Sequence, residues 1–253
     1  MKIKRKYAWK PDVADQRDHL YSSRVSQFPS KVDIIGRTDE IDDQGELGSC
    51  TGNSTAAMCE IILKTTQPLS RLMAYYNGRV IENTVKFDDG AQIRDVIKGI
   101  SNYGIGAEAI WPYDITKFAK KPPAAAYKDG ALRVKAGIMS YQRITDLSAL
   151  KAALAVGHVV TFGFSVPEYF ESQEVANTGW VRFPTQADKM VGGHAVVAVG
   201  YDDTVSTPFV WVRNSWGPTW GVNGYFRMDQ RWFTDPVRLV DDMWTIVPKG
   251  NSK

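Results

Sequence analysis

Cys50 stands where a reactive thiolate is expected. It follows Gly48 and Ser49, and an apolar helical pattern begins directly after it. The N-terminus of a helix carries partial positive charge and unpaired N–H groups, and both stabilise a thiolate. The N–H of Cys50 can also bind an oxyanion formed beside the sulfur, and Gln44, six residues earlier, can supply a second donor. These residues predict a cysteine nucleophile with an oxyanion hole.

A thiolate that cleaves amides needs a group that protonates the leaving amine, and histidine suits that role near neutral pH. The chain has three histidines: His19, His158 and His194. His194 follows two glycines and opens an apolar strand, whereas His158 is interpreted as structural. Asn214 follows the next predicted strand, and its amide oxygen can accept the imidazole N–H and fix the ring. Trp216 can keep water away from that hydrogen bond.

Three blocks in this order resemble the signature of the papain family of cysteine peptidases. They are Gln44-Gly45-x-x-Gly48-Ser49-Cys50, Gly193-His194-Ala195-Val196 and Asn214-Ser215-Trp216-Gly217-x-x-Trp220-Gly221-x-x-Gly224-Tyr225. In that family the histidine and asparagine follow the cysteine by roughly 130–150 residues. Here the separations are 144 and 164 residues, so the asparagine comes slightly late. The similarity covers about residues 30 to 248.

The resemblance implies an α+β, papain-like fold of two lobes. A helical left lobe and an antiparallel, β-barrel-like right lobe would enclose the active-site cleft. It also implies that peptide bonds are hydrolysed through a thioester acyl-enzyme on Cys50, with His194 and Asn214 completing the triad and Gln44 in the oxyanion hole. By the same analogy Gly90, Gly193 and Trp216 are candidate substrate-binding residues. The expected partner is a peptide or protein substrate, without a cofactor or a metal.

Two departures from the family pattern indicate a particular branch. Leu47 stands where the family usually has a disulfide-forming cysteine, and Thr51 replaces the usual aromatic residue after the nucleophile. These features resemble the prokaryotic or viral members of the family. They leave the substrate preference and the mode of activation open.

The secondary structure predicted to position these residues changes along the chain, from mostly helices in the first half to mostly strands in the second. Periodic apolar patterns predict helices over about residues 48–65, 69–81, 92–100 and 147–156. Runs of β-branched residues predict strands over residues 159–162, 195–199, 209–212 and 225–228. We therefore expect three parts: an N-terminal arm over residues 1–30, a mainly helical lobe with Cys50 over 31–125, and a mainly β lobe with His194 and Asn214 over 126–253.

The N-terminal arm carries aromatic residues that argue against a purely solvated tail, among them Tyr7 and Trp9. We expect it to lie over or near the cleft and to regulate access, with a purely structural strut as the alternative. Its acidic cluster comprises Asp12, Asp15, Asp18 and His19. The spacing matches no metal-ligand pattern, so turn and salt-bridge roles are expected.

Composition excludes several other classes of protein. The 253 residues carry a net charge of +3, which is too small to suggest a nucleic-acid partner. No run of about 18 apolar residues predicts a membrane span, and the basic start is not followed by the apolar stretch of a signal peptide. The localisation is therefore left open between the cytoplasm and export by a non-Sec route. A monomer is expected.

The two cysteines are not expected to form a disulfide. On one helix, Cys50 and Cys59 would lie on opposite faces and about 13 Å apart along the axis. A disulfide requires Cα atoms within roughly 7 Å. The chain is therefore expected to suit a reducing compartment or to be indifferent to redox conditions.

Two alternatives to hydrolysis stay open at this point. The acyl-enzyme could be passed to an amine, as in a ligase or a transglutaminase-like enzyme. The protein could also be a catalytically silent one that uses the cleft only for binding. The complete set of Cys50, His194 and Asn214 argues against the silent protein.

Overall fold

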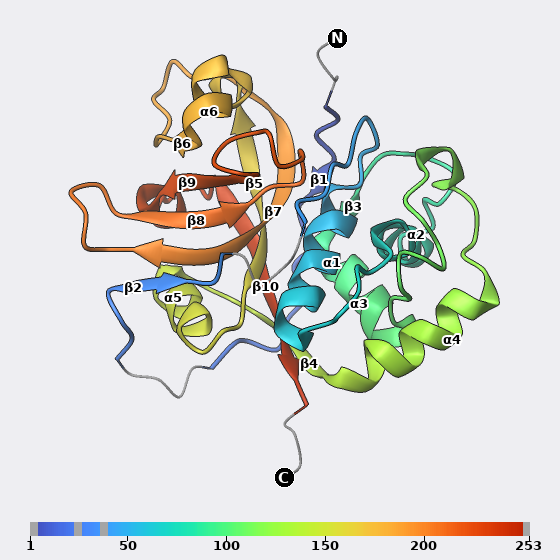
Figure 1. The fold of residues 1–253 in the computed structure, drawn as a ribbon. Coiled ribbons are helices and arrows are strands. Elements are labelled where there is room, and N and C mark those ends of the chain that lie inside the picture. Colours follow the sequence, from blue (N-terminus) through green and yellow to red (C-terminus); the bar gives the residue numbers. More distant parts are fainter. Residues whose placement is uncertain (1–4, 23–26, 36–39, 250–253) are drawn as a thin grey trace.

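Helix α1 (Cys50–Leu63) lies between a group of helices and a large sheet (Figure 1). The computed structural model describes residues 5–22, 27–35 and 40–249. Twelve of the fourteen residues of α1 are buried, as expected for a helix covered on all sides. The helices beside it are α2 (Arg71–Ile81), α3 (Ile93–Tyr103) and α4 (Ala124–Arg133).

The sheet on the other side of α1 has eight strands, in the order β4-β10-β5-β7-β8-β9-β6, with β2 also paired to β7. The strands are β2 (Lys31–Asp33), β4 (Ile138–Arg143), β5 (Val160–Pro167), β6 (Trp180–Val181), β7 (Met190–Asp202), β8 (Phe209–Arg213), β9 (Tyr225–Asp229) and β10 (Val240–Pro248). All pairs are antiparallel except β6 with β9. The long central strand β7 therefore reaches both β5 and β8, and it carries His194 toward α1.

Smaller elements cover the sheet. Helix α5 (Leu147–Ala155) and the short helix α6 (Gln173–Thr178) lie at opposite ends of it (Figure 1). Short 3₁₀ turns occur at Ile115–Lys117, Lys135–Gly137, Glu168–Glu171 and Gln230–Phe233.

Most predicted elements are present, with shifted ends. The four predicted helices correspond to α1, α2, α3 and α5, and the four predicted strands to β5, β7, β8 and β9. Helix α4 was not predicted, and it spans residue 125, where the sequence placed the boundary between two parts. Its sequence, AAAYKDGALR, has few large apolar residues, so the apolar periodicity gives little signal.

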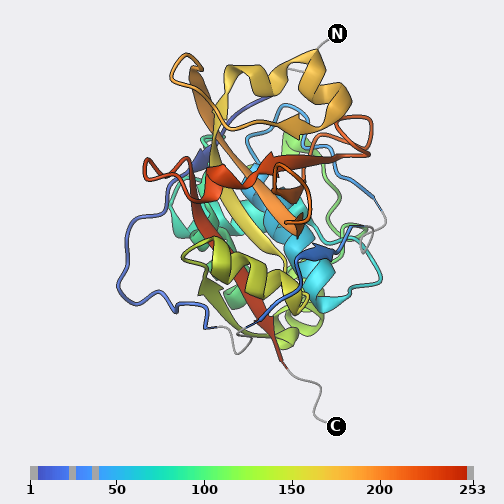
Figure 2. The same ribbon diagram turned by 90° about the vertical axis from the view of Figure 1, so that its left-hand side faces the viewer.

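The N-terminal segment is extended and crosses the molecule along one side (Figure 2). Its strand β1 (Trp9–Lys10) pairs in parallel with β3 (Ala91–Gln92), which directly precedes α3. Farther on, Tyr21 and His19 exchange backbone hydrogen bonds with Arg143 of β4. The segment is thus fixed to the helical side at one place and to the sheet at another.

Candidate active site

Cys50 is the first residue of α1, and its thiol is fully buried. The backbone N–H groups of Ala195, Ala8 and Thr51 and of Cys50 itself lie near the sulfur and favour a thiolate. Burial outweighs their effect and raises the pKa of Cys50 to about 11. The thiol therefore keeps its proton at neutral pH in this arrangement.

His194 lies on β7, one residue before Ala195, and its ring is fully buried. Its Nε2 is 2.9 Å from Oδ1 of Asn214, whereas Nδ1 has no hydrogen-bond partner among the described residues. Burial lowers the pKa of His194 to about 4, helped by the positive charge of Arg5 and opposed by the bond to Asn214. The imidazole is therefore neutral at pH 7 in this structure.

Ser215 fixes which nitrogen of His194 carries the proton. Its backbone N–H donates to Oδ1 of Asn214 at 2.9 Å, so the atom of Asn214 at that position is an acceptor and thus the oxygen. An oxygen can only accept from Nε2 of His194, which must then bear the hydrogen. In the neutral ring Nδ1 is consequently unprotonated, and it can take a proton from a thiol.

Aromatic rings surround the imidazole. Trp216 stacks on it with ring centroids 5.3 Å apart and an interplanar angle of 29°. Phe164 and Tyr7 contact it edge-on at centroid distances of 5.8 and 6.3 Å. This apolar shell excludes water from the bond between His194 and Asn214 and strengthens it.

Gln44 lies in the loop before α1 and is 1% exposed. Its Oε1 accepts a hydrogen bond from the Ser215 hydroxyl at 2.7 Å, which sets the orientation of the amide. Its Nε2 donates to the carbonyl of Leu47 at 3.1 Å. A primary amide has two N–H donors, so one remains beyond this bond for an oxyanion near Cys50.

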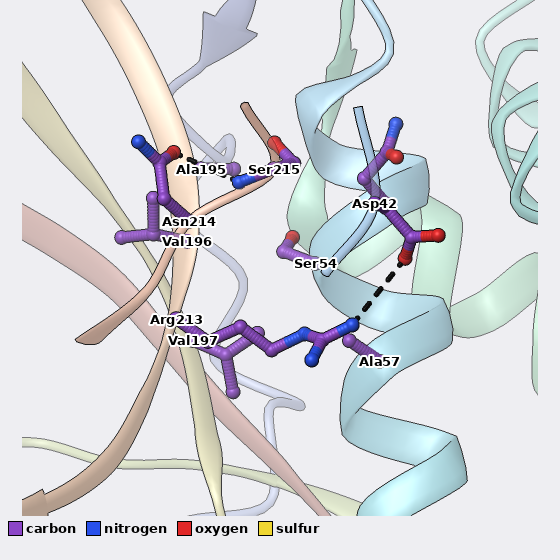
Figure 3. A pocket seen from close by; sticks show the side chains of 10 residues that line it. Asp42, Ser54, Ala57, Ala195, Val196, Val197, Arg213, Asn214 and Ser215 are labelled. Carbon is purple, nitrogen blue, oxygen red and sulfur yellow. Dashed lines mark hydrogen bonds and ion pairs between the residues drawn. The ribbon is translucent and has the colours of Figure 1, made fainter. Parts of the chain in front are cut away.

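A small cavity lies between α1 and the strands behind the triad (Figure 3). Its volume is about 10 Å³, and Ser54, Ala57, Val196 and Asn214 are among the residues that line it. It is too small for a substrate and can hold a single water molecule. At its edge Arg213 pairs with Asp42 at 3.6 Å, which links the sheet to the loop before α1.

The N-terminal segment covers the thiol. Ala8 is 6% exposed, and its backbone N–H lies near the sulfur, where it lowers the pKa of Cys50. Before it, Tyr7 contacts the rings of His194 and Trp216 and donates its hydroxyl proton to Glu171 at 2.5 Å. After it, Trp9 packs against Gly163 and Gly193 on the neighbouring strands β5 and β7. Residues 7 to 9 therefore occupy the space through which any ligand would reach the sulfur.

The three predicted substrate-binding residues all face this segment. A Cβ on Gly90 would overlap the carbonyl of Ala8, and Gly90 has a φ of +79°, which favours glycine. Gly193 lies against Trp9, and Trp216 contacts Tyr7 and lies under the guanidinium of Arg5 at 5.3 Å.

Charged groups fix the segment on both sides of the thiol. On one side Arg5 pairs with Asp43, and Lys6 pairs with Asp88. The carboxylate of Asp88 also accepts a hydrogen bond from the backbone N–H of Gly48 at 3.0 Å, close to Cys50.

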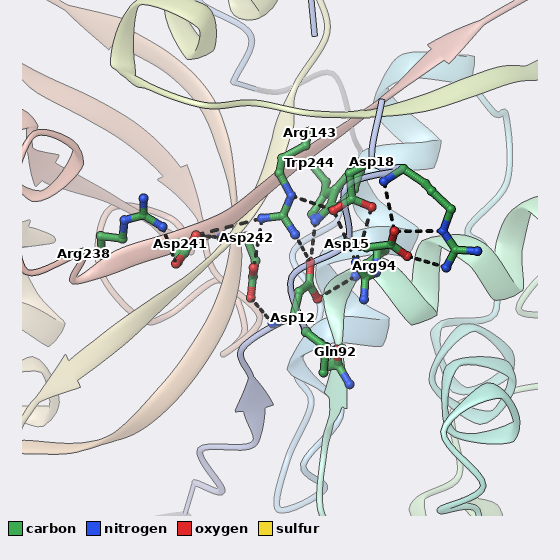
Figure 4. Close-up of polar contacts among 12 residues, drawn as sticks. Asp12, Asp15, Asp18, Gln92, Arg94, Arg143, Arg238, Asp241, Asp242 and Trp244 are labelled. Carbon is green, nitrogen blue, oxygen red and sulfur yellow. Dashed lines mark hydrogen bonds and ion pairs between the residues drawn. The ribbon is translucent and has the colours of Figure 1, made fainter. Parts of the chain in front are cut away.

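On the other side Arg143 of β4 is the centre of an ion-pair cluster (Figure 4). It contacts Asp12 at 2.9 Å, Asp18 at 3.1 Å and Asp242 at 3.2 Å, and Asp18 also pairs with Arg94 at 3.3 Å. The side chain of Asp12 is completely buried. Asp12 and Asp18, for which the sequence predicted salt-bridge roles, thus bind the segment to β4, β10 and α3.

Other residues singled out from the sequence lie away from the thiol. His158 is half-buried beside Tyr21, and burial lowers its pKa. Cys59 is buried in α1, burial raises its pKa, and both cysteines are free, as predicted. Several residues of the site give no signal in the sequence, because their contacts join distant parts of the chain: Ala8, Gly163, Asp88, Arg143 and Asp242.

Within the described residues, no group of three or more His, Cys, Asp or Glu side chains is arranged to hold a metal ion. In the same part of the chain, no helix combines the length and the apolar character needed to cross a membrane.

Comparisons with known proteins agree with this geometry. Residues 28–235 match the family model described as papain family cysteine protease. The chain is 43% identical over 215 residues to an uncharacterized peptidase C1-like protein of Acanthamoeba polyphaga mimivirus, covering 81% of this chain and 68% of that protein. It is 26% identical over 242 residues to pro-cathepsin H of Bos taurus, covering 90% of this chain and 68% of that protein. Xylellain, a cysteine protease from Xylella fastidiosa, has a similar structure with a TM-score of 0.85 and 37% identity, over 97% of this chain and 98% of that chain.

Proposed function

The chain belongs to the papain family of cysteine proteases and is a cysteine peptidase, and we propose that Cys50 is its nucleophile, His194 its base and Asn214 the residue that orients His194. The predicted resemblance and the papain-like, two-lobe α+β fold are thereby confirmed. No observation favours acyl transfer to an amine or a silent binding protein.

The observation that carries this proposal is the hydrogen bond between His194 and Asn214. With Nε2 held as the donor, Nδ1 takes the proton of Cys50 while the sulfur attacks the carbonyl carbon of the substrate. The oxyanion then accepts hydrogen bonds from the N–H of Cys50 and from Nε2 of Gln44. Nδ1 of His194 returns the proton to the leaving amine, which departs as a free N-terminus and leaves a thioester on Cys50. Water, deprotonated by the same nitrogen, hydrolyses that thioester.

The proposed substrate is an extended peptide that passes the residues now covered by the N-terminal segment. Gly90, Gly193 and Trp216 are its proposed contacts, since each faces residues 5 to 9. The leaving amine must lie beside His194, which protonates it, and Tyr7 occupies that side. The acyl part of the substrate then lies on the side of Trp9.

The same contacts support the expectation that the N-terminal segment inhibits the enzyme. It runs from the leaving-group side at Tyr7 to the acyl side at Trp9, whereas a peptide bound for cleavage has its N-terminal part on the acyl side. The segment therefore runs in the direction opposite to the proposed substrate. It blocks the thiol of Cys50 without presenting a carbonyl in the orientation for attack.

The test is covalent labelling with an epoxysuccinyl thiol-protease inhibitor, followed by mass spectrometry. We expect Cys50→Ala to lose the label and Cys59→Ala, which removes the other buried thiol, to keep it. Weakening the segment with Trp9→Ala should speed labelling of the full chain. Equal labelling of wild type and Cys50→Ala would refute the assignment of the nucleophile.

Turnover separates hydrolysis from the alternatives. A peptide library with an added amine should give only hydrolysed products by mass spectrometry, and Cys50→Ser should abolish them. Transfer of the acyl group to the amine as the main product would favour a ligase.

A further inference from the structure

We propose that Asp88 is a positioning residue that holds the side-chain amide of Gln44 in place for the oxyanion. It acts through one peptide unit, the bond between Leu47 and Gly48. This inference rests on the proposed function, in which Gln44 supplies one of the two donors to the oxyanion. It gives Asp88 a role beyond its ion pair with Lys6 of the N-terminal segment.

The peptide unit between Leu47 and Gly48 is hydrogen-bonded at both of its polar groups. Its carbonyl accepts a hydrogen bond from Nε2 of Gln44 at 3.1 Å. Its N–H donates to the carboxylate of Asp88, with Oδ1 at 3.0 Å and Oδ2 at 3.2 Å. The carbonyl and the N–H of a trans peptide point in opposite directions, so Gln44 and Asp88 hold this unit from opposite sides.

The hydrogen bond from Gly48 to Asp88 bears on the amide of Gln44 in two ways. Its acceptor is a carboxylate, so the bond is charge-assisted, and it polarises the peptide unit and makes the carbonyl of Leu47 a stronger acceptor. It also fixes the tilt of the peptide plane. The direction in which Nε2 of Gln44 presents its second N–H, the one proposed for the oxyanion, depends on that tilt.

Gly48 leaves room for the carboxylate to approach the backbone. A Cβ at this position would lie 3.0 Å from Oδ1 of Asp88 and 2.8 Å from the Cβ of Ala8. A side chain here would therefore push Asp88 away from the N–H that donates to it. The absence of a side chain lets the carboxylate act on the backbone two residues before Cys50.

Asp88 is itself held by helix α2. The hydroxyl of Tyr75 donates to Oδ1 of Asp88 at 2.7 Å and accepts a hydrogen bond from the N–H of Gly90 at 3.2 Å. The fully buried Arg79 lies over the ring of Tyr75, 3.9 Å from its centroid, and donates to the carbonyl of Phe87 at 3.0 Å. None of these contacts involves the N-terminal segment, so we expect them to persist when a substrate replaces it.

The ion pair with Lys6 allows the positioning role to be distinguished from simple anchoring. Nζ of Lys6 lies 3.0 Å from Oδ2 of Asp88, so Asp88 also holds the N-terminal segment. If Asp88 only anchored the segment, its loss would open the site and speed turnover. Because it positions Gln44, its loss should instead slow turnover once the segment is open.

The experiment uses the full chain with Lys6→Ala and Trp9→Ala, which we call the open chain. These changes remove the ion pair to Asp88 and weaken the cover over the thiol. In the open chain we expect Asp88→Ala to lower kcat for a peptide substrate by about 10-fold with little change in KM, less than the roughly 100- to 1,000-fold for loss of a whole oxyanion donor. Asp89→Ala, at the exposed neighbouring position, is the matched control and should leave kcat unchanged.

Gln44→Ala in the open chain tests whether Asp88 acts through Gln44. With Gln44 already lost, Asp88→Ala should change kcat by less than about twofold, because the effects of two residues that act through one contact do not add. An equal loss with and without Gln44 would overturn the inference. A rise in kcat when Asp88→Ala is added to the open chain would also overturn it.

Two conservative variants keep the test decisive if Asp88→Ala does not fold, which thermal unfolding reports. Asp88→Asn keeps an oxygen that can accept the N–H of Gly48, so kcat should stay within about threefold of the open chain. Tyr75→Phe removes the hydroxyl that holds Asp88 and should lower kcat by about threefold, again only while Gln44 is present. A loss in Tyr75→Phe that persists without Gln44 would contradict the proposal.

A peptide aldehyde separates this inference from the proposed function. The thiol of Cys50 adds across the aldehyde carbonyl and leaves its oxygen in the oxyanion hole, so Asp88→Ala should weaken aldehyde binding about 10-fold. Alkylation of Cys50 by iodoacetamide forms no oxyanion, and its rate should not fall. Aldehyde binding that depends on Asp88 only while Gln44 is present, without turnover of any peptide, would support the role of Asp88 and refute the proposed catalytic cycle. Cleavage that requires Cys50 but not Asp88 would refute the role of Asp88 alone.

Discussion

At the scale of single residues, the protonation of the site depends on backbone N–H groups and on the side chain of Asn214. The N–H of Ser215 makes Oδ1 of Asn214 an acceptor, and this in turn places the proton of His194 on Nε2. The chemistry proposed for Nδ1 of His194 therefore depends on a residue that never touches the substrate. Backbone N–H groups of Cys50 and Thr51, by contrast, act on the sulfur directly and lower the pKa of the thiol.

Asn214→Ala tests this arrangement. Without the acceptor the ring of His194 loses its fixed tautomer and orientation, so we expect kcat/KM to fall by about 100-fold, within the range for a positioned general base. The lower rate should be accompanied by a changed pH profile, which a purely structural role would not produce. Asn177→Ala, on the exposed face of α6, is the control, and a loss of less than twofold in Asn214→Ala would contradict the prediction.

The thiol of Cys50 should respond to pH according to whether the segment covers it. Burial raises its pKa to about 11, so in the covered state the rate of alkylation by iodoacetamide should increase as the pH rises toward that value. Trp9→Ala should shift the whole profile to lower pH, because solvent then reaches the sulfur and the N–H groups of the helix dominate. Both proteins carry Cys59→Ala so that a single thiol is followed. Identical profiles would show that the segment does not affect the thiol.

The sequence revealed the candidate triad because its signals are local. Cys50 follows a glycine and a serine at a helix start, and Asn214 follows a strand, so each motif could be recognised in a few residues. Asp242 and Gly163 gave no such signal. Their role depends on contacts with Trp9, more than 150 residues away, and on a register shift in β10 that no periodicity predicts.

At the scale of elements, the N-terminal segment is held by ion pairs rather than by its own secondary structure. Its only strand, among the residues described, has two residues. Asp12 contributes most: its carboxylate accepts hydrogen bonds from Arg143, from Nε1 of Trp244 at 2.7 Å and from the backbone N–H of Arg94 at 3.2 Å.

Asp12→Ala should therefore release the segment. The change leaves the guanidinium of Arg143, the indole N–H of Trp244 and the backbone N–H of Arg94 without this acceptor. We expect it to lower the free energy of unfolding by about 3 kcal/mol. The peptidase rate of the full chain should rise accordingly. Denaturant unfolding and initial rates measure both effects.

Asp15→Ala is the matched control within the same segment. Asp15 pairs with Arg17, whose side chain is 87% exposed, so the change should alter stability by less than about 0.5 kcal/mol. A similar gain in rate for Asp12→Ala and Asp15→Ala would contradict the role assigned to the ion-pair cluster.

Element types were largely predictable, whereas their lengths were not. Strand β7 extends to thirteen residues although only five form the apolar run, since its first residues are exposed and lie beside the N-terminal segment. Strands β4 and β10 were not predicted from the sequence. Strand β10 contains adjacent Asp241 and Asp242, which break the apolar alternation and serve the ion-pair cluster instead.

At the scale of the whole molecule, the two sides share one core. Buried apolar residues of the helices and of the sheet form a single cluster, with α1 at its centre. Ser54 of α1 even shares a hydrogen bond with Thr161 of β5 inside this core, at 2.9 Å. Without α1, the apolar faces of both the other helices and the sheet would be exposed to solvent.

Met58→Ala should therefore destabilise both sides together. Met58 is fully buried in α1, and its truncation should lower the free energy of unfolding by about 3 kcal/mol. Far-ultraviolet circular dichroism and tryptophan fluorescence should report one shared transition that moves to lower denaturant concentration. Leu132→Ala, at an exposed position of α4, should leave the transition at the denaturant concentration of the wild type. Two separate transitions would show that the sides unfold independently.

The direction of the N-terminal segment has a consequence for how activity would begin. A chain that passes its own sulfur backwards cannot be shortened there by the same molecule. Any cut that frees the site must then come from a second copy that is already open, or from another protease. In a stored solution, peptidase activity would appear slowly at first and would then increase faster as open copies accumulate. It would appear sooner at a higher protein concentration.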